Sequence, residues 1–213
     1  MIADRWPLFG LVLRTPRLEL RVPDLDRLAE LAAVAAGGLH DPGVQPFVAE
    51  WTDQAPERVA SSVLQWHWGT WAGWRPEKWE LGLVAIADGR AVGTQSIGGA
   101  DFATLREVGT GSWLGRAEHG RGLGTEMRAA VLELAFTGLG AELATSEAFE
   151  DNPASYAVSR KLGYADDGTD RYVVRGAPLV SRRLRLDRKS WEEARAIPVE
   201  IEGLEASLPM FGL

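Results

Sequence analysis

The chain has 213 residues, 46% hydrophobic and 25% charged, which is typical of a globular protein, and we expect residues 1–213 to form a single domain. The lack of cysteine excludes disulfides, thiolate metal ligands and a cysteine nucleophile, and we expect no metal site. The net charge of −7 argues against a nucleic-acid partner. The first residues do not resemble a signal peptide, and no apolar run reaches the roughly 20 residues of a membrane span. We therefore expect a cytoplasmic protein without a membrane span.

Hydrophobic periodicity predicts a mixed α and β protein without repeats or linkers. Apolar residues alternate with polar ones in the strand-like segments and recur every three or four positions in the helix-like ones. In chain order, strands are expected at 18–22, 79–87, 91–97, 108–114, 142–149, 170–175 and 180–186. Helices are expected after Asp24, from Pro56, over 123–136 and over 153–161.

Local signals place several boundaries of these elements. Asp24 is a candidate N-cap for the first helix, and Gly37-Gly38 would end it. Pro56 suits the first turn of the second helix. Asp88-Gly89 is a strong hairpin signal between two strands, and Gly163 is a good residue just beyond a helix.

A glycine-rich turn, His119-Gly120-Arg121-Gly122-Leu123-Gly124-Thr125, joins the strand at 108–114 to the helix at 123–136. Glycines at alternate positions let the backbone approach an anion, and the first helical amides would point at that anion. The turn lacks the lysine of a P-loop and the spacing of a dinucleotide fingerprint. It indicates a phosphate or pyrophosphate cradle, or else a tight turn that uses glycine only for backbone freedom.

Three further segments accompany the turn: Thr15-Pro16-Arg17-Leu18-Glu19-Leu20-Arg21, Gly111-Ser112-Trp113-Leu114, and Asn152-Pro153-Ala154-Ser155 with Lys161-Leu162-Gly163-Tyr164. His119, Gly122 and Gly124 occupy the marked positions of a Gln/Arg-x-x-Gly-x-Gly/Ala pattern. In this order, the four segments resemble the GCN5-related N-acetyltransferases, in the branch of the RimJ/RimL-type ribosomal-protein N-terminal acetyltransferases. The resemblance covers about residues 14–186 and leaves the tail, 187–213, outside.

The resemblance implies the GNAT fold, in which a central, mostly antiparallel, twisted sheet of about seven strands is flanked by about four helices and two strands splay around a coenzyme A site. It implies an N-acyltransferase that moves an acyl group from acyl-CoA to a primary amine by direct transfer in a ternary complex. Acetyl-CoA is the default donor and succinyl-CoA an alternative. The acceptor would be a protein N-terminus, a lysine or a small amine, and a homodimer or higher homo-oligomer is one assembly to test.

The resemblance also implies which residues hold the co-substrate. The backbone of the strand before the turn would stabilise the oxyanion, which indicates Trp113 and Leu114. Asn152 and Ser155 would line the thiol end, and Arg160 would reach the phosphates. The turn would hold the pyrophosphate, with Arg121 adding positive charge, through His119, Gly120, Arg121, Gly122, Leu123, Gly124 and Thr125. A helix start disfavours a charged histidine, which favours a structural role for His119.

The candidate catalytic residues are fewer than the residues expected to hold the co-substrate. The Ser155 hydroxyl would protonate the departing thiolate, or would only cap the helix that follows. Relatives often place a glutamate at the position of Gly109, and Glu107 would share that face of a regular strand as the candidate base. Asp101 is an alternative base or a contact for the acceptor amine, and His40 is a further candidate contact for that amine. The tyrosine that many members of the wider family carry on the later helix is replaced by a serine here, at position 159.

Tryptophan is concentrated between Trp66 and Trp79. Val59, Val63 and Trp66 share one face of the expected helix, so this segment would pack on the core or on a second subunit, or would form an apolar wall of the acceptor pocket.

Two other classes of function stay open. The missing glutamate at Gly109 is consistent with an acyl-CoA-binding module that does not catalyse transfer. The Trp-rich segment and the tail, through 191–197 and 208–211, would instead dock on a partner in an oligomeric interaction protein.

Overall fold

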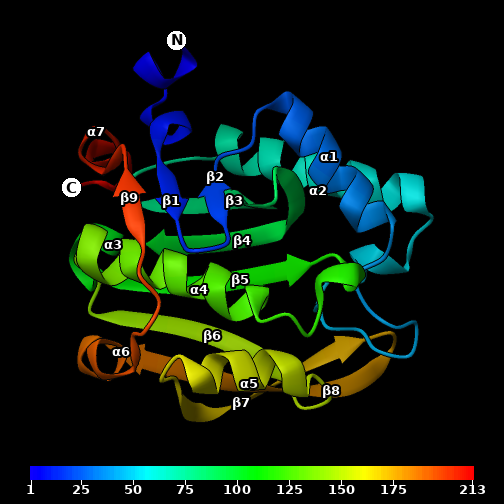
Figure 1. Cartoon of the computed structure of the whole chain (residues 1–213). Coiled ribbons are helices and arrows are strands. Elements are labelled where there is room, and N and C mark those ends of the chain that lie inside the picture. The colour runs from blue at the N-terminus through cyan, green and yellow to red at the C-terminus, as the bar shows by residue number, and fades with distance from the viewer.

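The computed structural model describes residues 1–213 and contains one nine-stranded sheet in the order β7-β8-β6-β5-β4-β3-β2-β1-β9 (Figure 1). The strands are β1 (Val12–Arg14), β2 (Glu19–Arg21), β3 (Lys78–Ala87), β4 (Arg90–Ala100), β5 (Glu107–Leu114), β6 (Leu143–Phe149), β7 (Ala165–Val174), β8 (Ala177–Asp187) and β9 (Glu200–Glu202). The helices are α1 (Leu25–Ala36), α2 (Pro56–Ala72), α3 (Phe102–Leu105), α4 (Leu123–Glu133), α5 (Pro153–Lys161), α6 (Arg188–Ala194) and α7 (Leu204–Ser207). None of them combines the length and apolar character that crossing a membrane requires.

The expected mixed architecture is confirmed, with more elements than the sequence indicated. The sheet has nine strands rather than about seven, because β1 and β9 add three residues each, too few to show a periodicity. The hairpin at Asp88-Gly89 is confirmed: both residues have positive φ, 49° and 76°, and β3 and β4 pair on either side. The expected long helix ends as α4 at Glu133 and continues as a wider π turn over Leu134–Gly138.

The only parallel pairing in the sheet is short. β5 and β6 pair from Glu107↔Leu143 to Gly109↔Thr145 and no further. Beyond that point β5 stays paired with β4 as far as Gly93↔Leu114, while β6 stays paired with β8 as far as Phe149↔Ser181. The two strands therefore diverge and leave a gap in the sheet, which opens to the right in Figure 1.

Helices cover both faces of the sheet, with α1 and α2 on one face and α4 and α5 on the other (Figure 1). Asp24 caps α1 as expected, since its side chain accepts a hydrogen bond of 2.8 Å from the Arg27 amide. α1 and α2 bury a cluster of apolar residues against Val84 and Ala91 of the sheet. A larger apolar cluster surrounds α4, and it joins the two sides of the gap into one core.

The buried face of α2 differs from the expected one. Val59 and Val63 are buried, but Trp66 is 40% exposed and His67 is fully buried instead. His67 lies four residues after Val63 and so continues the same face, whereas Trp66 is turned toward its edge. A Cβ at Gly82 would meet both rings, so the glycine allows α2 to lie close to β3.

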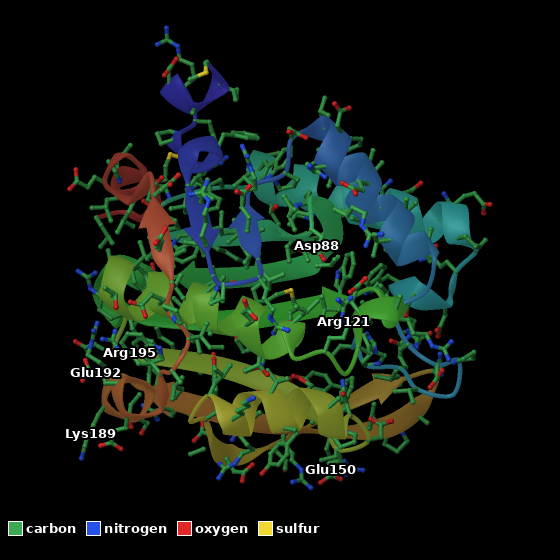
Figure 2. The ribbon with its side chains drawn as sticks, in the orientation of Figure 1. Asp88, Arg121, Glu150, Lys189, Glu192 and Arg195 are labelled. Carbon is green, nitrogen blue, oxygen red and sulfur yellow. The ribbon has the colours of Figure 1, made fainter.

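The tail folds back on the same chain. It passes α4, where Arg195 pairs with Glu133 at 3.5 Å, and β9 then pairs with β1 in the register Leu13↔Ile201 (Figure 2). Trp191 and Phe211 are both buried in the core of their own chain. The expectation that these apolar residues are free to dock on a partner is therefore wrong, because the chain itself covers them.

The tail residue Phe211 should contribute strongly to stability, because its ring packs at 4.8 Å from Trp79 and 5.6 Å from Trp74 between ring centroids. We expect Phe211→Ala to lower the free energy of unfolding by about 3–5 kcal/mol in urea denaturation. Leu213→Ala is the control: its side chain is 37% exposed, and the change should stay within about 0.5 kcal/mol. Equal effects of the two substitutions would contradict the packing described here.

The buried His67 should make stability depend on pH. Neither ring nitrogen has a hydrogen-bond partner, and burial lowers the pKa of His67 from 6.5 to about 4. As the pH falls, the ring takes up a proton at a higher pH in the unfolded chain than in the folded one. Its contribution to the free energy of unfolding is therefore fully present above pH 6.5 and is lost as the pH falls toward 4. Relative to His67→Leu, the wild type should lose about 3 kcal/mol across this window in pH-dependent urea denaturation. A wild type and a His67→Leu variant that lose stability in parallel across this window would contradict the burial of a neutral ring described here.

Candidate active site

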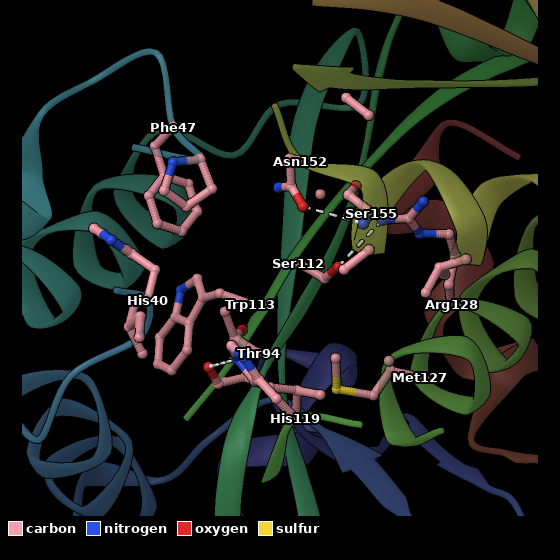
Figure 3. Close-up of a pocket in the computed structure, with 18 of the residues that line it drawn as sticks. His40, Phe47, Thr94, Ser112, Trp113, His119, Met127, Arg128, Asn152 and Ser155 are labelled. Carbon is pink, nitrogen blue, oxygen red and sulfur yellow. Dashed lines mark hydrogen bonds between the residues drawn. The ribbon is translucent and has the colours of Figure 1, made fainter. Parts of the chain in front are cut away.

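A cavity of about 970 Å³ passes through the gap between β5 and β6. Its lining comes from both faces of the sheet, so the gap opens to either side (Figure 3). The loop at 39–51 and part of α2 line one side, and the glycine turn, α4 and the start of α5 line the other. An opening of this size is large enough for a small-molecule ligand.

Most of the residues expected at the site from the sequence line this cavity. They come together from the loop after α1, from β5, from the turn and from α5, although these segments are far apart in the chain. They are His40, Trp113, Leu114, His119, Gly120, Gly122, Leu123, Gly124, Thr125, Asn152 and Ser155.

Four expected residues lie outside the cavity. Arg121 is exposed and forms an ion pair with Glu118 at the surface (Figure 2). Arg160 donates a hydrogen bond of 2.7 Å to the Tyr164 carbonyl at the end of its own helix.

The two carboxylates among these four are exposed as well. Glu107 is the first residue of β5 and pairs with Leu143, where β5 and β6 are still joined, so it lies at the closed end of the gap. Asp101 is the residue before α3, with a φ of 49°.

The glycine turn presents a row of free backbone donors. Gly120 and Gly122 have φ of 73° and 79°, a conformation that favours glycine. From Gly120 to Thr125, no backbone N–H donates to another residue of the chain, and no side chain caps the start of α4. Unpaired amides at a helix N-terminus suit an anion, so the turn has the free donors that a phosphate cradle requires.

Two contacts fix the position of the turn. The His119 ring donates to the Leu114 carbonyl across 3.1 Å, which ties the start of the turn to the end of β5. Buried Glu126 accepts hydrogen bonds from the Thr15 hydroxyl at 2.6 Å and the Arg17 amide at 2.9 Å, and the Arg17 guanidinium pairs with it at 2.6 Å. Burial raises the pKa of Glu126, but these hydrogen bonds outweigh it and the net shift is downward.

Ser155 does not cap its helix with its side chain. The cap is Asn152, whose Oδ1 accepts a hydrogen bond of 3.1 Å from the Ser155 amide. The Ser155 hydroxyl has no hydrogen-bond partner in the chain, and Ser155 lines the cavity near Asn152 (Figure 3). It is therefore free to contact a ligand there.

An aromatic wall lines the cavity on the side of α1 and α2. Trp113 lies 6.1 Å from Trp51 between ring centroids, and Phe47 lies 5.3 Å from Trp51. Trp66 is the only tryptophan of the Trp-rich segment that lines the cavity, and His67 beside it lines the cavity as well; Trp74 and Trp79 are in the core.

The loop that carries this wall is held to the β7–β8 turn. Arg175 donates hydrogen bonds of 2.6 and 2.7 Å to Asp53 and one of 3.2 Å to the Pro42 carbonyl. The hydrogen bonds from Arg175 lower the pKa of Asp53. His40 is fixed in the same loop by its ring contact of 2.8 Å with the Thr52 hydroxyl.

Glu147 and Arg128 are among the cavity residues that the sequence did not indicate. Glu147 on β6 lines the cavity and accepts hydrogen bonds of 3.0 Å from the Tyr172 hydroxyl and 3.3 Å from the Ser181 hydroxyl. Arg128 on α4 lines it as well, although its side chain is almost fully buried. Neither stands out in the sequence, because each looks like an ordinary charged residue of a strand or helix.

Comparisons with known proteins give the same fold and a family. Residues 17–165 match the family of the acetyltransferase (GNAT) domain. RimJ of Mycobacterium smegmatis, solved with CoA disulfide, has a TM-score of 0.65 and 19% identity over 94% of each chain. RimL, a ribosomal L7/L12 alpha-N-protein acetyltransferase solved with coenzyme A, has a TM-score of 0.66 and 15% identity over 84% of this chain and 99% of its own.

The microcin C7 self-immunity acetyltransferase MccE, solved with acetyl-CoA and AMP, has a TM-score of 0.63 and 15% identity over 81% of this chain and 93% of its own. The likeness in fold covers nearly the whole chain of each of these three relatives. The family match covers most of the chain and includes β2 to β6 with the glycine turn. The protein belongs to the GNAT family of acetyltransferases.

Proposed function

We propose that the protein transfers an acyl group from acyl-CoA to a primary amine, directly within a ternary complex. One observation carries this proposal: the gap between β5 and β6 ends at a glycine turn whose backbone donors are free from Gly120 to Thr125. The turn would hold the pyrophosphate of coenzyme A. That RimL and MccE were solved with coenzyme A and acetyl-CoA supports the assignment.

The gap itself fits the pantetheine arm. On the side of β6, the backbone of Thr110–Leu114 has no strand to pair with. An extended amide chain can pair with such an edge in the way an added strand does. The N–H groups of Trp113 and Leu114 would then lie along the thioester arm, where one of them stabilises the negative charge that develops on the carbonyl oxygen.

The remaining side chains supply the proton transfers. The amine nitrogen attacks the thioester carbon, a C–N bond forms and the C–S bond breaks. We propose Ser155 as the acid that protonates the departing thiolate, since its hydroxyl is free at the cavity. For the base, Glu147 is the better candidate than Glu107, because Glu147 lines the cavity and Glu107 lies outside it.

The acceptor would enter from the opposite side. Phe47, Trp51 and Trp113 form an apolar wall there, and Glu147 adds a negative charge that suits a protonated amine. We propose a protein N-terminus, a lysine or a small amine as the acceptor, in a cytoplasmic enzyme.

A carboxylate placed at the pyrophosphate site should abolish co-substrate binding. Gly124 is the better position than Gly122, because a side chain at Gly122 would also strain a backbone with a φ of 79°. We expect Gly124→Glu to weaken binding of free CoA by at least about tenfold in calorimetric titration, since like charges repel at short range. Gly69→Glu, at an exposed position in α2 with open space around it, should bind as the wild type does. A wild type that binds no CoA would show that the glycine turn does not hold a pyrophosphate.

Loss of the acid should slow turnover without weakening binding. We expect Ser155→Ala to lower kcat by about 100-fold in a thiol-release assay with a panel of amines, while the calorimetric affinity for CoA stays the same. Ser61→Ala, which removes a hydroxyl bonded to the Glu57 carbonyl in α2 and outside the cavity, should leave kcat unchanged. Wild-type binding of CoA with no turnover on any amine would instead favour the non-catalytic module that the missing glutamate at Gly109 suggested.

A further inference from the structure

Arg128 is a buried cation without an anion. Its side chain is 4% exposed, and its guanidinium donates to the hydroxyls of Ser159 at 2.6 Å, Ser146 at 3.3 Å and Ser112 at 3.3 Å. Its Nε has no partner at all. None of the ion pairs in the chain includes Arg128, although most of the other arginines near the site pair with a carboxylate.

An unpaired charge is costly in a protein interior. Burial lowers the pKa of Arg128, which reflects this cost, but a guanidinium remains protonated. Buried charges in proteins are normally paired, because three neutral hydroxyls do not replace the attraction of an anion. A structural role alone would be served better by an apolar side chain. The missing anion is therefore expected to come from a ligand.

The guanidinium lies toward the closed end of the gap. Ser146 on β6 directly follows the last paired residue Thr145, and Ser112 on β5 lies three residues beyond Gly109. The glycine turn lies past the other end of β5, after Leu114. A thioester arm that runs along β5 from the turn therefore brings its acyl group toward Arg128. Figure 3 shows the Arg128 side chain reaching from α4 toward Ser112, beside Ser155.

Arg128 approaches from the side of the donor rather than of the acceptor. Neighbouring residues of a strand point to opposite faces, so Ser112 meets Arg128 on one face while Trp113 meets Trp51 of the aromatic wall on the other. The same helix, α4, carries Arg128 and begins at the glycine turn. A carboxylate that reaches Arg128 is thus expected on the acyl group and not on the amine.

We propose that Arg128 binds a carboxylate at the far end of the acyl group, so that the preferred donor is the CoA thioester of a short dicarboxylic acid such as succinyl-CoA. The inference rests on the proposed function and names its substrate class. The hydroxyls of Ser112 and Ser146 would turn to donate to the same carboxylate. During transfer the C–N bond forms and the C–S bond breaks at the other end of the acyl group, and the carboxylate keeps its charge throughout.

Two matched donors test this inference in the absence of any acceptor. Succinyl-CoA and butyryl-CoA have acyl chains of equal length and differ in the terminal carboxylate. We expect the wild type to bind succinyl-CoA at least about tenfold more tightly in calorimetric titration, because hydrogen bonds between charged groups have effects of this size. Arg128→Met should remove the difference and keep the affinity for free CoA, while Arg128→Lys should keep part of the difference.

The melting temperature gives a readout independent of ligand. Arg128→Met should raise it in the ligand-free protein, because the variant removes an unpaired buried charge. A lower melting temperature together with an unchanged donor preference would assign Arg128 a structural role and overturn the proposal.

The outcomes separate this inference from the proposed function. A wild type that binds free CoA but binds succinyl-CoA no more tightly than butyryl-CoA overturns the role of Arg128 and leaves the transferase proposal standing. A wild type that binds none of the three overturns the proposed function itself. A preference for carboxylates that appears only when a carboxylate-bearing amine is added would place the anion on the acceptor, which also contradicts the proposal.

Discussion

β5 is not paired with β6 beyond Gly109, and the other residues of the candidate site lie around this unpaired part of β5. Backbone N–H and C=O groups inside a protein need partners, so a strand that faces a gap in the middle of a sheet is costly unless something completes it. The gap meets free amide donors at one end and a buried guanidinium at the other. The amide donors and the free edge of β5 lack partners in the chain and the guanidinium lacks an anion, and one extended, anionic ligand would supply all of these.

The gap is held open by contacts outside it. β5 is fixed along its whole length by β4, and β6 by β8, so neither strand can move to close the sheet. Glu126 and Arg17 hold the glycine turn against the β1–β2 loop, and Arg175 holds the aromatic loop against the β7–β8 turn. The site is therefore shaped before a ligand arrives, which lowers the conformational entropy lost on binding.

Sequence reasoning succeeded where the signal was local. Asp24 and Asp88-Gly89 each act within a few residues and have the roles expected of them, and two glycines of the turn have the positive φ that favours glycine. It failed where the role of a residue depends on neighbours from other strands and helices. Glu147 and Arg128 matter only because β5 and β6 diverge beside them, and nothing in either segment shows where that divergence begins. The edge strands β1 and β9 were missed because three residues carry no periodicity.

The pairing of β9 with β1 also sets an order of events during synthesis. β9 follows every other strand in the sequence, yet it pairs with the first. Until it emerges, β1 presents an open edge, and the rings of Trp74 and Trp79 lack the cover of Phe211. Such pairing between distant segments forms slowly, and open strand edges invite association between chains. A chain cut short before β9 would therefore keep β1 as an open edge and leave Trp74 and Trp79 without the cover of Phe211, both of which favour association between chains.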